Sequence, residues 1–282
     1  MSSVAYVNGA YLPLARAGVS IEDRGFQFAD AVYEVWGVRD GRLMDEAGHF
    51  ARLWRSLKEL RITVPMAQSS LRAVLLETKR RNRVRDGIIY LQVSRGVAPR
   101  DHGFPSPPVS PSVIVTAKSL DQRKIAARME RGVSVITAPD NRWGRCDIKT
   151  VGLLPNVLAR QTASEAGAYD CWFVDAGGYV TEGSASNAWI VDKSGALRTA
   201  PLSANILHGV TRAAFIALAR AHQMRVVEES FTVADVKEAR EAFLTSASNA
   251  ALPVISIDGT PIGDGKPGDI AARLRAAYER AA

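Results

Sequence analysis

The chain has 282 residues, 47% of them hydrophobic, and its 36 lysines and arginines against 29 acidic residues give a formal net charge of +7. This length suggests two domains, and the apolar content excludes a largely disordered chain. No apolar stretch approaches the ~20 residues of a membrane-spanning helix, and the N-terminal sequence lacks a signal-peptide pattern, so we expect a cytoplasmic protein with no membrane partner.

The basic surplus and the two cysteines limit the partners further. The longest basic run, Lys79-Arg80-Arg81, is not interleaved with aromatic residues, so we expect no nucleic-acid partner. Cys146 and Cys171 are too few and too far apart for a disulfide framework or a CxxC metal site. We therefore predict two free thiols and no metal.

The first part of the chain alternates strand-like runs with amphipathic helices. Asp40-Gly41 between two apolar runs indicates a hairpin, and Phe50, Leu53 and Leu57 recur at helical spacing. In chain order, the predicted elements are strands over 4–14, a hairpin over 31–43, helices over 49–62 and 71–84, and strands over 87–96 and 112–120.

The second part begins with a strand and closes with a helix. Pro155 suits the first turn of a helix that ends near Gly167, and Gly209 opens another helix. The predicted elements are a strand over 132–139, a helix over 156–168, three strands within 169–197, helices over 208–224 and 231–239, a strand, loop and strand over 241–259, and a helix over 266–282.

Strands and helices mix here without the strict alternation that a doubly wound parallel sheet requires, so we predict an α+β fold. Residues 119–130 are polar and charged, which is typical of a connection between domains. We therefore expect a small N-terminal domain over 1–118 and a larger C-terminal domain over 131–282.

Lys149 stands in the segment DIKTVGLLPN, where the chain becomes apolar. Burial lowers the pKa of an ammonium group and exposes the free amine as a nucleophile, so Lys149 is a candidate Schiff-base lysine. The alternative is an ordinary lysine whose flexible stem carries the charge to water.

An acid and two small-residue segments form a second set of candidates. Glu182 ends a predicted strand just before small residues, although a strand-end glutamate in water is the commoner case. Residues 208–212 and 245–249 could bind an anion through backbone N–H groups, and the first of them lies at a helix start. Such a start is also an ordinary helix cap.

Arg100 and His102 lie two residues apart in a loop bounded by proline and glycine. Alternate residues of an extended loop point the same way, so both could bind one carboxylate, or they could simply be solvated. Taken together, an amine, an acid, a phosphate site and a carboxylate site are the groups needed for pyridoxal phosphate to act on an amino acid.

Six motifs in order resemble the fold type IV pyridoxal-phosphate enzymes, the class IV aminotransferases, and among them most closely the D-amino-acid transaminases. These motifs are FADAVYEV, HFARLWRSL, DIKTVGLLPNVLA, VTEGSASNAW, ILHGVTR and FLTSASNAALPV. The resemblance covers nearly the whole chain. It implies the two-domain architecture of that family, pyridoxal 5'-phosphate as cofactor and a homodimer.

The resemblance also assigns roles to individual residues. Lys149 would form the Schiff base with the cofactor and move the proton at the substrate Cα, Glu182 would pair with the pyridine nitrogen, and Tyr33 would lie near the lysine and the substrate. Leu207 would pack against the cofactor ring. The positions that would bind the phosphate are Arg52, Val210, Thr211, Ser246 and Ala247.

For the substrate, the resemblance implies ping-pong transamination between D-amino acids such as D-alanine and 2-oxo acids such as 2-oxoglutarate, with Arg100 and His102 on the α-carboxylate. Branched-chain L-aminotransferase, (R)-selective amine transaminase and aminodeoxychorismate lyase remain alternatives, and a non-catalytic basic binding protein is a remote one. Ala29 and Ala31 depart from the family pattern, which has glycine at both positions, and the SASN segment replaces one richer in threonine.

Overall fold

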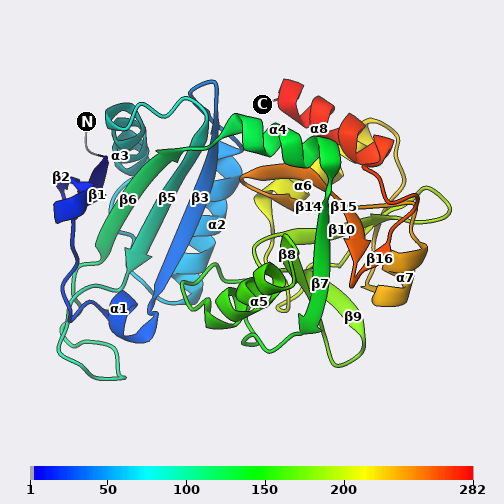
Figure 1. The fold of residues 1–282 in the computed structure, drawn as a ribbon. Helices are drawn as coiled ribbons and strands as arrows, with labels where there is room; N and C mark the ends of the chain where they lie inside the picture. The colour runs from blue at the N-terminus through cyan, green and yellow to red at the C-terminus, as the bar shows by residue number, and fades with distance from the viewer. Residues whose placement is uncertain (1–2, 282) are drawn as a thin grey trace. The chain divides into compact units, whose positions relative to one another are not determined.

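The computed structural model describes residues 3–281 and divides into two compact units (Figure 1). The first unit runs to Asp121 and also includes Ile148–Gly152, while the second consists of Gln122–Asp147 and the chain from Leu153 onward. This division differs from the predicted domains in placing Lys149 with the first unit. The reason is a β-bridge between Thr150 and Val32, which attaches the lysine segment to a strand of the first sheet.

The first unit is built on a six-stranded antiparallel sheet in the order β2-β1-β6-β5-β3-β4. Its strands are β1 (Val4–Val7), β2 (Ala10–Pro13), β3 (Ala31–Arg39), β4 (Arg42–Leu43), β5 (Gly87–Ser94) and β6 (Ser112–Ser119). Its helices are the short 3-10 helix η1 (Leu14–Arg16), α1 (Arg24–Phe28), α2 (Glu46–Glu59) and α3 (Gln68–Arg81).

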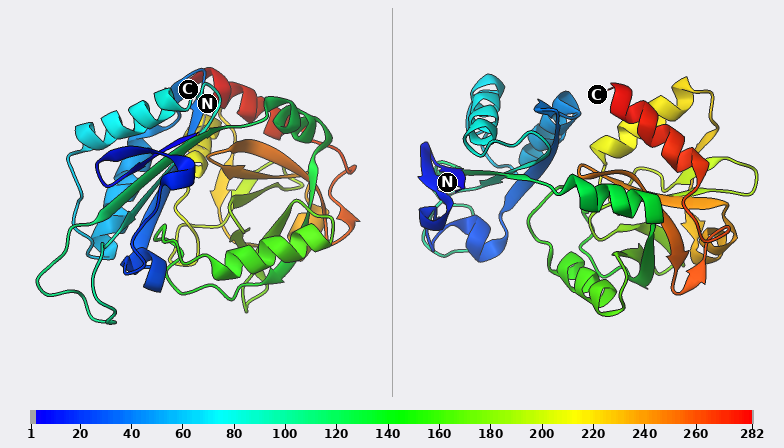
Figure 2. Two further views of the ribbon diagram at one scale, coloured as in Figure 1. Left: turned by 60° about the vertical axis from the view of Figure 1, so that its left-hand side comes forward. Right: turned by 45° about the horizontal axis from the view of Figure 1, so that its top comes forward.

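Helices α2 and α3 pack against the sheet of the first unit (Figures 1 and 2). Leu53 and Leu57 of α2 are fully buried against Trp36 and other alternate residues of the strands. Successive side chains of a strand point to opposite faces, so the even-numbered residues of β3 face the helices and the odd-numbered residues, including Tyr33, face away. The even-numbered residues of β3 therefore build the core beneath the helices, and the odd-numbered residues lie on the opposite face of the sheet.

The second unit contains a ten-stranded mixed sheet, whose main path is β12-β11-β10-β14-β15-β7-β8-β9-β13, with β16 paired to β15. Its strands are β7 (Val133–Pro139), β8 (Asp170–Val174), β9 (Tyr179–Gly183), β10 (Asn187–Val191), β11 (Leu197–Thr199), β12 (Val226–Glu228), β13 (Phe231–Thr232), β14 (Glu241–Ser246), β15 (Asn249–Ile257) and β16 (Thr260–Pro261). Its helices are α4 (Gln122–Arg131), α5 (Leu154–Glu165), α6 (Val210–Ala221), α7 (Val233–Glu238) and α8 (Asp269–Ala281).

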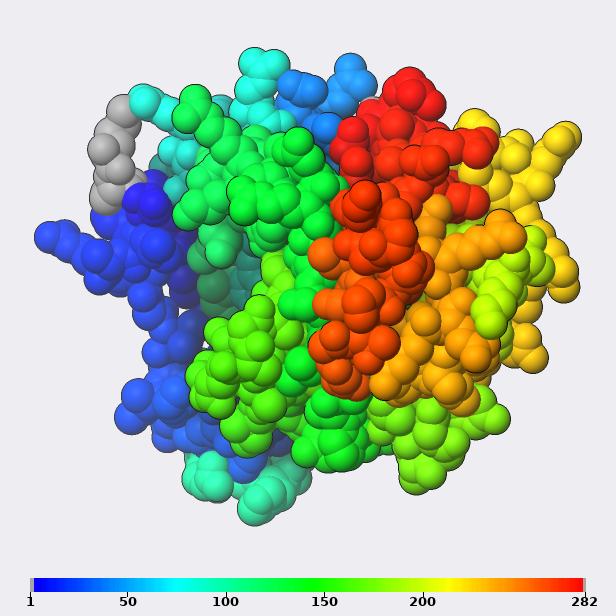
Figure 3. Space-filling view, turned by 45° about the vertical axis from the view of Figure 1, so that its right-hand side comes forward, coloured from blue at the N-terminus to red at the C-terminus, as the bar shows by residue number. Residues whose placement is uncertain are grey.

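Both faces of this sheet are covered. Trp172 and Ile190 point into one apolar cluster, whereas the neighbouring Phe173 packs with helix α5 on the opposite face. Helix α8 lies beside α4 (Figure 3). The Arg275 guanidinium of α8 contacts the Met129 sulfur of α4 at 3.3 Å. Strands buried on both faces explain the long apolar runs in this part of the sequence.

The predicted α+β class is confirmed, and most predicted elements are present. Besides the short η1, two α-helices were not anticipated: α1 follows Asp23, whose carboxylate caps the helix through the Gly25 N–H, and α4 occupies most of the predicted connection over 119–130. Ala29 is the C-cap of α1 with a φ of 56°, a left-handed conformation that glycine adopts more easily than alanine. Among residues 3–281, no helix is long and apolar enough to cross a membrane.

Candidate active site

The main chain of Lys149 runs beside strand β3, where Thr150 bridges Val32, and its side chain lies with Tyr33 on the face of the sheet opposite helices α2 and α3. Its carbonyl accepts a hydrogen bond from the Tyr33 N–H at 2.9 Å, and its Nζ lies 4.1 Å from the centroid of the Tyr33 ring. An aromatic face attracts an ammonium ion and gives the flexible stem a defined direction. The structure therefore brings together the lysine and the tyrosine that the sequence assigned to one site.

Arg52 lies on the other face of the same sheet, in a buried ion-pair cluster. Its Nε and Nη2 donate to the two oxygens of Glu34 at 2.7 and 2.8 Å, and the His49 Nδ1 lies 2.8 Å from that carboxylate. Burial favours the neutral acid, but the Arg52 charge and the hydrogen bonds of Arg52 and His49 outweigh it and hold the pKa of Glu34 at about 2. In this structure Arg52 thus neutralises a buried acid, and its predicted phosphate contact stays a prediction.

Replacing Glu34 with glutamine should destabilise the first unit at neutral pH by about 3 kcal/mol, because it removes one partner of a buried charge pair. The pKa of Glu34 is depressed from 4.5 to about 2, so its stabilisation is complete above pH 4.5 and lost as the pH falls towards 2. The difference between wild type and Glu34→Gln should therefore shrink by about 1 kcal/mol between pH 6 and pH 3.5. Urea unfolding at several pH values measures it.

The matched control is Glu77→Gln, since Glu77 pairs with Arg80 and Arg81 on the surface of α3. A solvated pair contributes little, so this variant should unfold like wild type at every pH. A pH-independent effect of Glu34→Gln would contradict the charge assignment and leave only a packing role for that side chain.

Arg100 and His102 lie in an exposed loop of the first unit, and both contact the same aromatic ring. The Arg100 guanidinium carbon is 4.7 Å from the centroid of the Phe28 ring, and the centroid of the His102 ring is 5.3 Å from it. The structure thus places the two predicted carboxylate-binding side chains around one ring.

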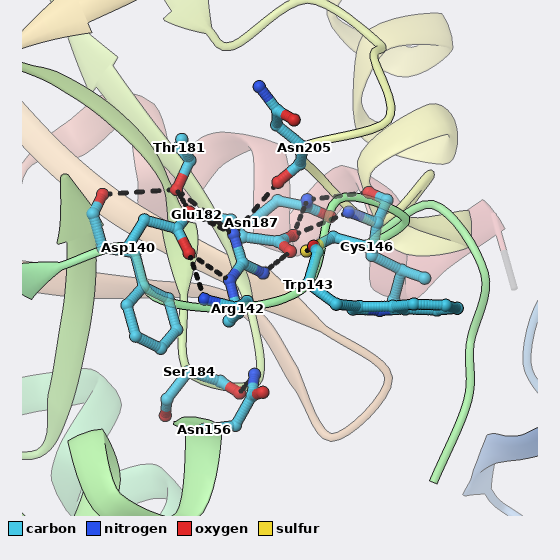
Figure 4. Close-up of polar contacts among 12 residues, drawn as sticks. Asp140, Arg142, Trp143, Cys146, Asn156, Thr181, Glu182, Ser184, Asn187 and Asn205 are labelled. Atoms are coloured by element: carbon cyan, nitrogen blue, oxygen red, sulfur yellow. Dashed lines mark hydrogen bonds and ion pairs between the residues drawn. The ribbon is translucent and has the colours of Figure 1, made fainter. Parts of the chain in front are cut away.

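Glu182 is the penultimate residue of strand β9 in the second unit, where it is buried and held on both oxygens (Figure 4). One oxygen forms an ion pair with Arg142. The other accepts hydrogen bonds from the Asn187 side-chain amide and the Leu207 N–H, each at 3.0 Å. These donors stabilise a carboxylate anion and fix its direction.

Arg142 is a residue that the sequence alone did not single out. Its guanidinium also forms an ion pair with Asp140 and donates to the Asn205 carbonyl at 3.0 Å (Figure 4). It lies over the Phe173 ring as well. Burial lowers the pKa of an arginine, but the Asp140 hydrogen bond and the charges of Glu182 and Asp140 outweigh it and raise the pKa of Arg142. In the sequence, the sign of this role is that Arg142 and Asp140 stand only seven and nine residues before Lys149.

The first predicted phosphate segment, residues 208–212, lies close to Glu182, and Asn187 connects the two by hydrogen bonds. The Asn187 amide donates both to Glu182 and to the Leu207 carbonyl, just before helix α6 begins at Val210. A Cβ on Gly209 would lie 1.9 Å from the Asn187 side-chain oxygen, so only glycine fits there. No side chain caps α6 at Gly209, and the first N–H groups of a helix have no partner within it.

The second predicted phosphate segment, residues 245–249, forms a short turn between two strands where the sequence predicted a loop. Ser246 ends β14 and pairs with Asn249 of β15, so only Ala247 and Ser248 form the turn. Thr245 pairs with Asn187 on the adjacent strand. The second unit therefore collects Glu182, Leu207, Val210, Thr211, Ser246 and Ala247 at neighbouring ends of its strands and helix.

Known proteins resemble this chain over nearly its whole length. Residues 31–257 match the profile of the family described as amino-transferase class IV. The chain is 38% identical over 275 residues to D-alanine aminotransferase of Staphylococcus haemolyticus, covering 98% of this chain and 96% of the relative, and 38% identical over 272 residues to that of Bacillus licheniformis, covering 96% and 94%.

Solved structures share the fold. A hypothetical aminotransferase of Mycobacterium tuberculosis, solved in a PLP-bound form, matches with a TM-score of 0.85 and 27% identity, over 99% of this chain and 98% of that one. The branched-chain amino acid aminotransferase of Escherichia coli matches in fold, with a TM-score of 0.90 at 24% identity, over 99% of this chain and 94% of that one. Because these relatives carry different substrate names, the substrate has to be argued from the residues.

Proposed function

Because the chain belongs to the class IV aminotransferases, we propose that it exchanges amino groups between D-amino acids and 2-oxo acids, with pyridoxal 5'-phosphate as its cofactor. D-Alanine and 2-oxoglutarate are the first pair to test. The observation that carries the substrate is the placement of Arg100 and His102 around the Phe28 ring, in a chain 38% identical to proteins named D-alanine aminotransferase.

The residues present suit this cofactor by their chemistry. When bound, pyridoxal phosphate supplies an aldehyde that takes the amino group and an electron-poor ring that stabilises negative charge at the substrate Cα. Lys149 offers the amine that holds the cofactor and moves the proton at Cα, and Tyr33 directs that amine. Glu182, already fixed by three donors, holds positive charge at the pyridine nitrogen.

The remaining contacts with the cofactor are assigned to the second unit and to Arg52. The uncapped start of α6 suits a phosphate, since its N–H groups and the helix dipole favour an anion. Leu207 packs against the ring. The phosphate donors are the N–H groups of Val210 and Ala247 and the hydroxyl groups of Thr211 and Ser246, and Arg52 would add its guanidinium while it stays bound to Glu34.

The substrate carboxylate is assigned to Arg100 and His102. Near them lie two further arginines, Arg24 and Arg95, which share the single carboxylate of Asp30. Since Asp30 binds both of these arginines and Asp101 stands between Arg100 and His102, the assignment rests on Arg100, whose guanidinium can hold a carboxylate with two hydrogen bonds. Holding the carboxylate at a fixed place decides which enantiomer turns its Cα–H toward the base, which is how this pair would select D-amino acids.

The test is Arg100→Ala in half-reactions with D-alanine, L-leucine and (R)-1-phenylethylamine. Loss of a charged hydrogen-bond partner should lower kcat/KM for D-alanine by about 10- to 100-fold, because such bonds contribute about 1.5–3 kcal/mol. The amine has no carboxylate, so its kcat/KM should not change. Arg85→Ala, which removes an exposed arginine paired with Asp40, is the matched control.

Two results would contradict the proposal. Equal losses for D-alanine and for the amine would make Arg100 a structural residue. Faster turnover of L-leucine than of any D-amino acid by the wild-type enzyme would favour the branched-chain alternative.

We also propose a cytoplasmic homodimer. Helix α5 exposes Leu154, Val157 and Leu158 by 68%, 59% and 57%, and a second copy could cover such an apolar face. Cys146 and Cys171 are both free cysteines, which is typical of proteins in a reducing compartment. Sedimentation of the cofactor-loaded enzyme would report the assembly state.

A further inference from the structure

A buried arginine, Arg24, connects the interior of the first unit to the loop that carries Arg100 and His102. Arg24 is 3% exposed. Its Nη1 donates to the carbonyl oxygen of Asp101 at 2.6 Å, and its Nη2 donates to that of His102 at 3.3 Å. The guanidinium therefore holds the main chain of the loop at two consecutive residues.

The third donor of Arg24 attaches it to a fixed point. Its Nε donates to Asp30 at 2.8 Å, and Arg95 binds the same carboxylate through Nε at 2.7 Å and Nη2 at 2.9 Å. Burial favours the neutral acid, but the hydrogen bonds and charges of the two arginines outweigh it and lower the pKa of Asp30. Arg95 also donates to the carbonyl oxygens of Leu60 and Arg61, both at 2.7 Å.

The same arginines contact the aromatic rings beside the loop. The guanidinium carbon of Arg24 lies 4.9 Å from the centroid of the Phe28 ring, which Arg100 and His102 also contact. Arg95 lies 3.6 Å from the centroid of the Phe104 ring, farther along the loop. The loop is thus held at Asp101 and His102 through their carbonyl groups and at Phe104 through its ring.

We propose that Arg24 is the positioning residue of this loop and, through the Asp101 and His102 carbonyl groups, sets where Arg100 and His102 present their side chains to the substrate carboxylate. This inference rests on the proposed function for the role of Arg100. Arg24 itself does not contact the substrate. Its contribution is geometric, because three donors of one planar group span an acid and two carbonyl oxygens in a fixed arrangement.

The chosen variant is Arg24→Lys, which keeps a positive charge beside Asp30 but cannot span all three acceptors. In the cofactor-loaded enzyme, the KM for D-alanine should rise about tenfold, since a small displacement of a positioned group has effects of this order or larger. The kcat should change less than about threefold, because Lys149 and Tyr33 are untouched. Arg85→Lys on the surface is the control and should change neither constant.

A second measurement reports the loop without any substrate. Trypsin can cleave after Arg100 only when the loop leaves its place, so Arg24→Lys should be cleaved there about tenfold faster than wild type. Mass spectrometry identifies the product that begins at Asp101. The Arg85→Lys control should be cleaved at the wild-type rate.

The double variant separates positioning from a general structural role. If Arg24 acts through Arg100, then Arg24→Lys should raise the KM no further once Arg100 is alanine. An equal effect of Arg24→Lys on the KM in both backgrounds, or unchanged cleavage after Arg100, would overturn the inference.

Failure of the proposed function gives a different result. If Arg100→Ala alone leaves the KM for D-alanine unchanged, the carboxylate assignment is wrong. Trypsin cleavage then decides the inference by itself: faster cleavage of Arg24→Lys supports Arg24 as the residue that holds the loop, and unchanged cleavage rejects it.

Discussion

Replacing Lys149 with alanine should lower the rate of transamination by about 10⁴-fold or more, because it removes both the amine that holds the cofactor and the base that moves the proton at Cα. The fold should survive, since the main-chain contacts remain: the Lys149 carbonyl accepts from the Tyr33 N–H, and its N–H donates to the Ser56 hydroxyl. Single-turnover kinetics with D-alanine and absorbance of the desalted protein measure the effect.

The control for Lys149→Ala is Lys193→Ala. Lys193 is exposed and pairs with Glu238 on the surface of the second unit, so its loss should change neither the rate nor the near-visible absorbance. If Lys149→Ala kept more than roughly a tenth of the activity, the lysine would be one whose charge reaches water. That is the alternative that the sequence alone left open.

Local patterns were sufficient to predict most elements and the order of the motifs. The apolar spacing predicted a helix over 49–62, and α2 spans Glu46–Glu59. The sequence placed a helix start at Gly209, and the structure has it as the N-cap of α6. These features depend on neighbours within a few residues, which is why the sequence shows them.

Long-range contacts were not predictable in the same way. Thr150 bridges Val32 across more than a hundred residues, and this bridge moves Lys149 into the first unit. Arg24 reaches carbonyl groups 77 and 78 residues away, and Arg142 reaches Glu182 over 40 residues. A single arginine in a sequence carries no sign of its partner. The sequence therefore did not predict that Arg24 holds the loop or that Arg142 holds Glu182.

The structure also explains why two neighbouring residues of one strand have different roles, one beside the reactive lysine and one in the core. Tyr33 and Glu34 are neighbours in β3 but point to opposite faces, so one lies beside Lys149 and the other pairs with Arg52 in the core. Glu34 stabilises the fold through its ion pair with Arg52. The tyrosine is left on the face that carries the reactive amine.

Replacing Glu182 with glutamine should lower kcat/KM for D-alanine by about 10²- to 10³-fold, the usual effect of removing one charge-stabilising group from an active site. Glutamine has nearly the same shape but no charge, so it cannot hold positive charge at the pyridine nitrogen. Its NH₂ group would also face a donor, either Arg142 or the Asn187 amide, where the carboxylate accepts from both. Cofactor affinity should therefore fall together with the rate.

The control for Glu182→Gln is Glu238→Gln, which makes the same change at an exposed acid paired with Lys193 and should leave the rate and the cofactor affinity unchanged. Arg142 keeps its ion pair with Asp140 in the Glu182→Gln protein, so the second unit should remain folded and the loss should be chemical. A rate within about threefold of wild type would mean that the pyridine nitrogen does not depend on this carboxylate. In that case the three donors around Glu182 would serve only to hold strand β9 against the start of helix α6.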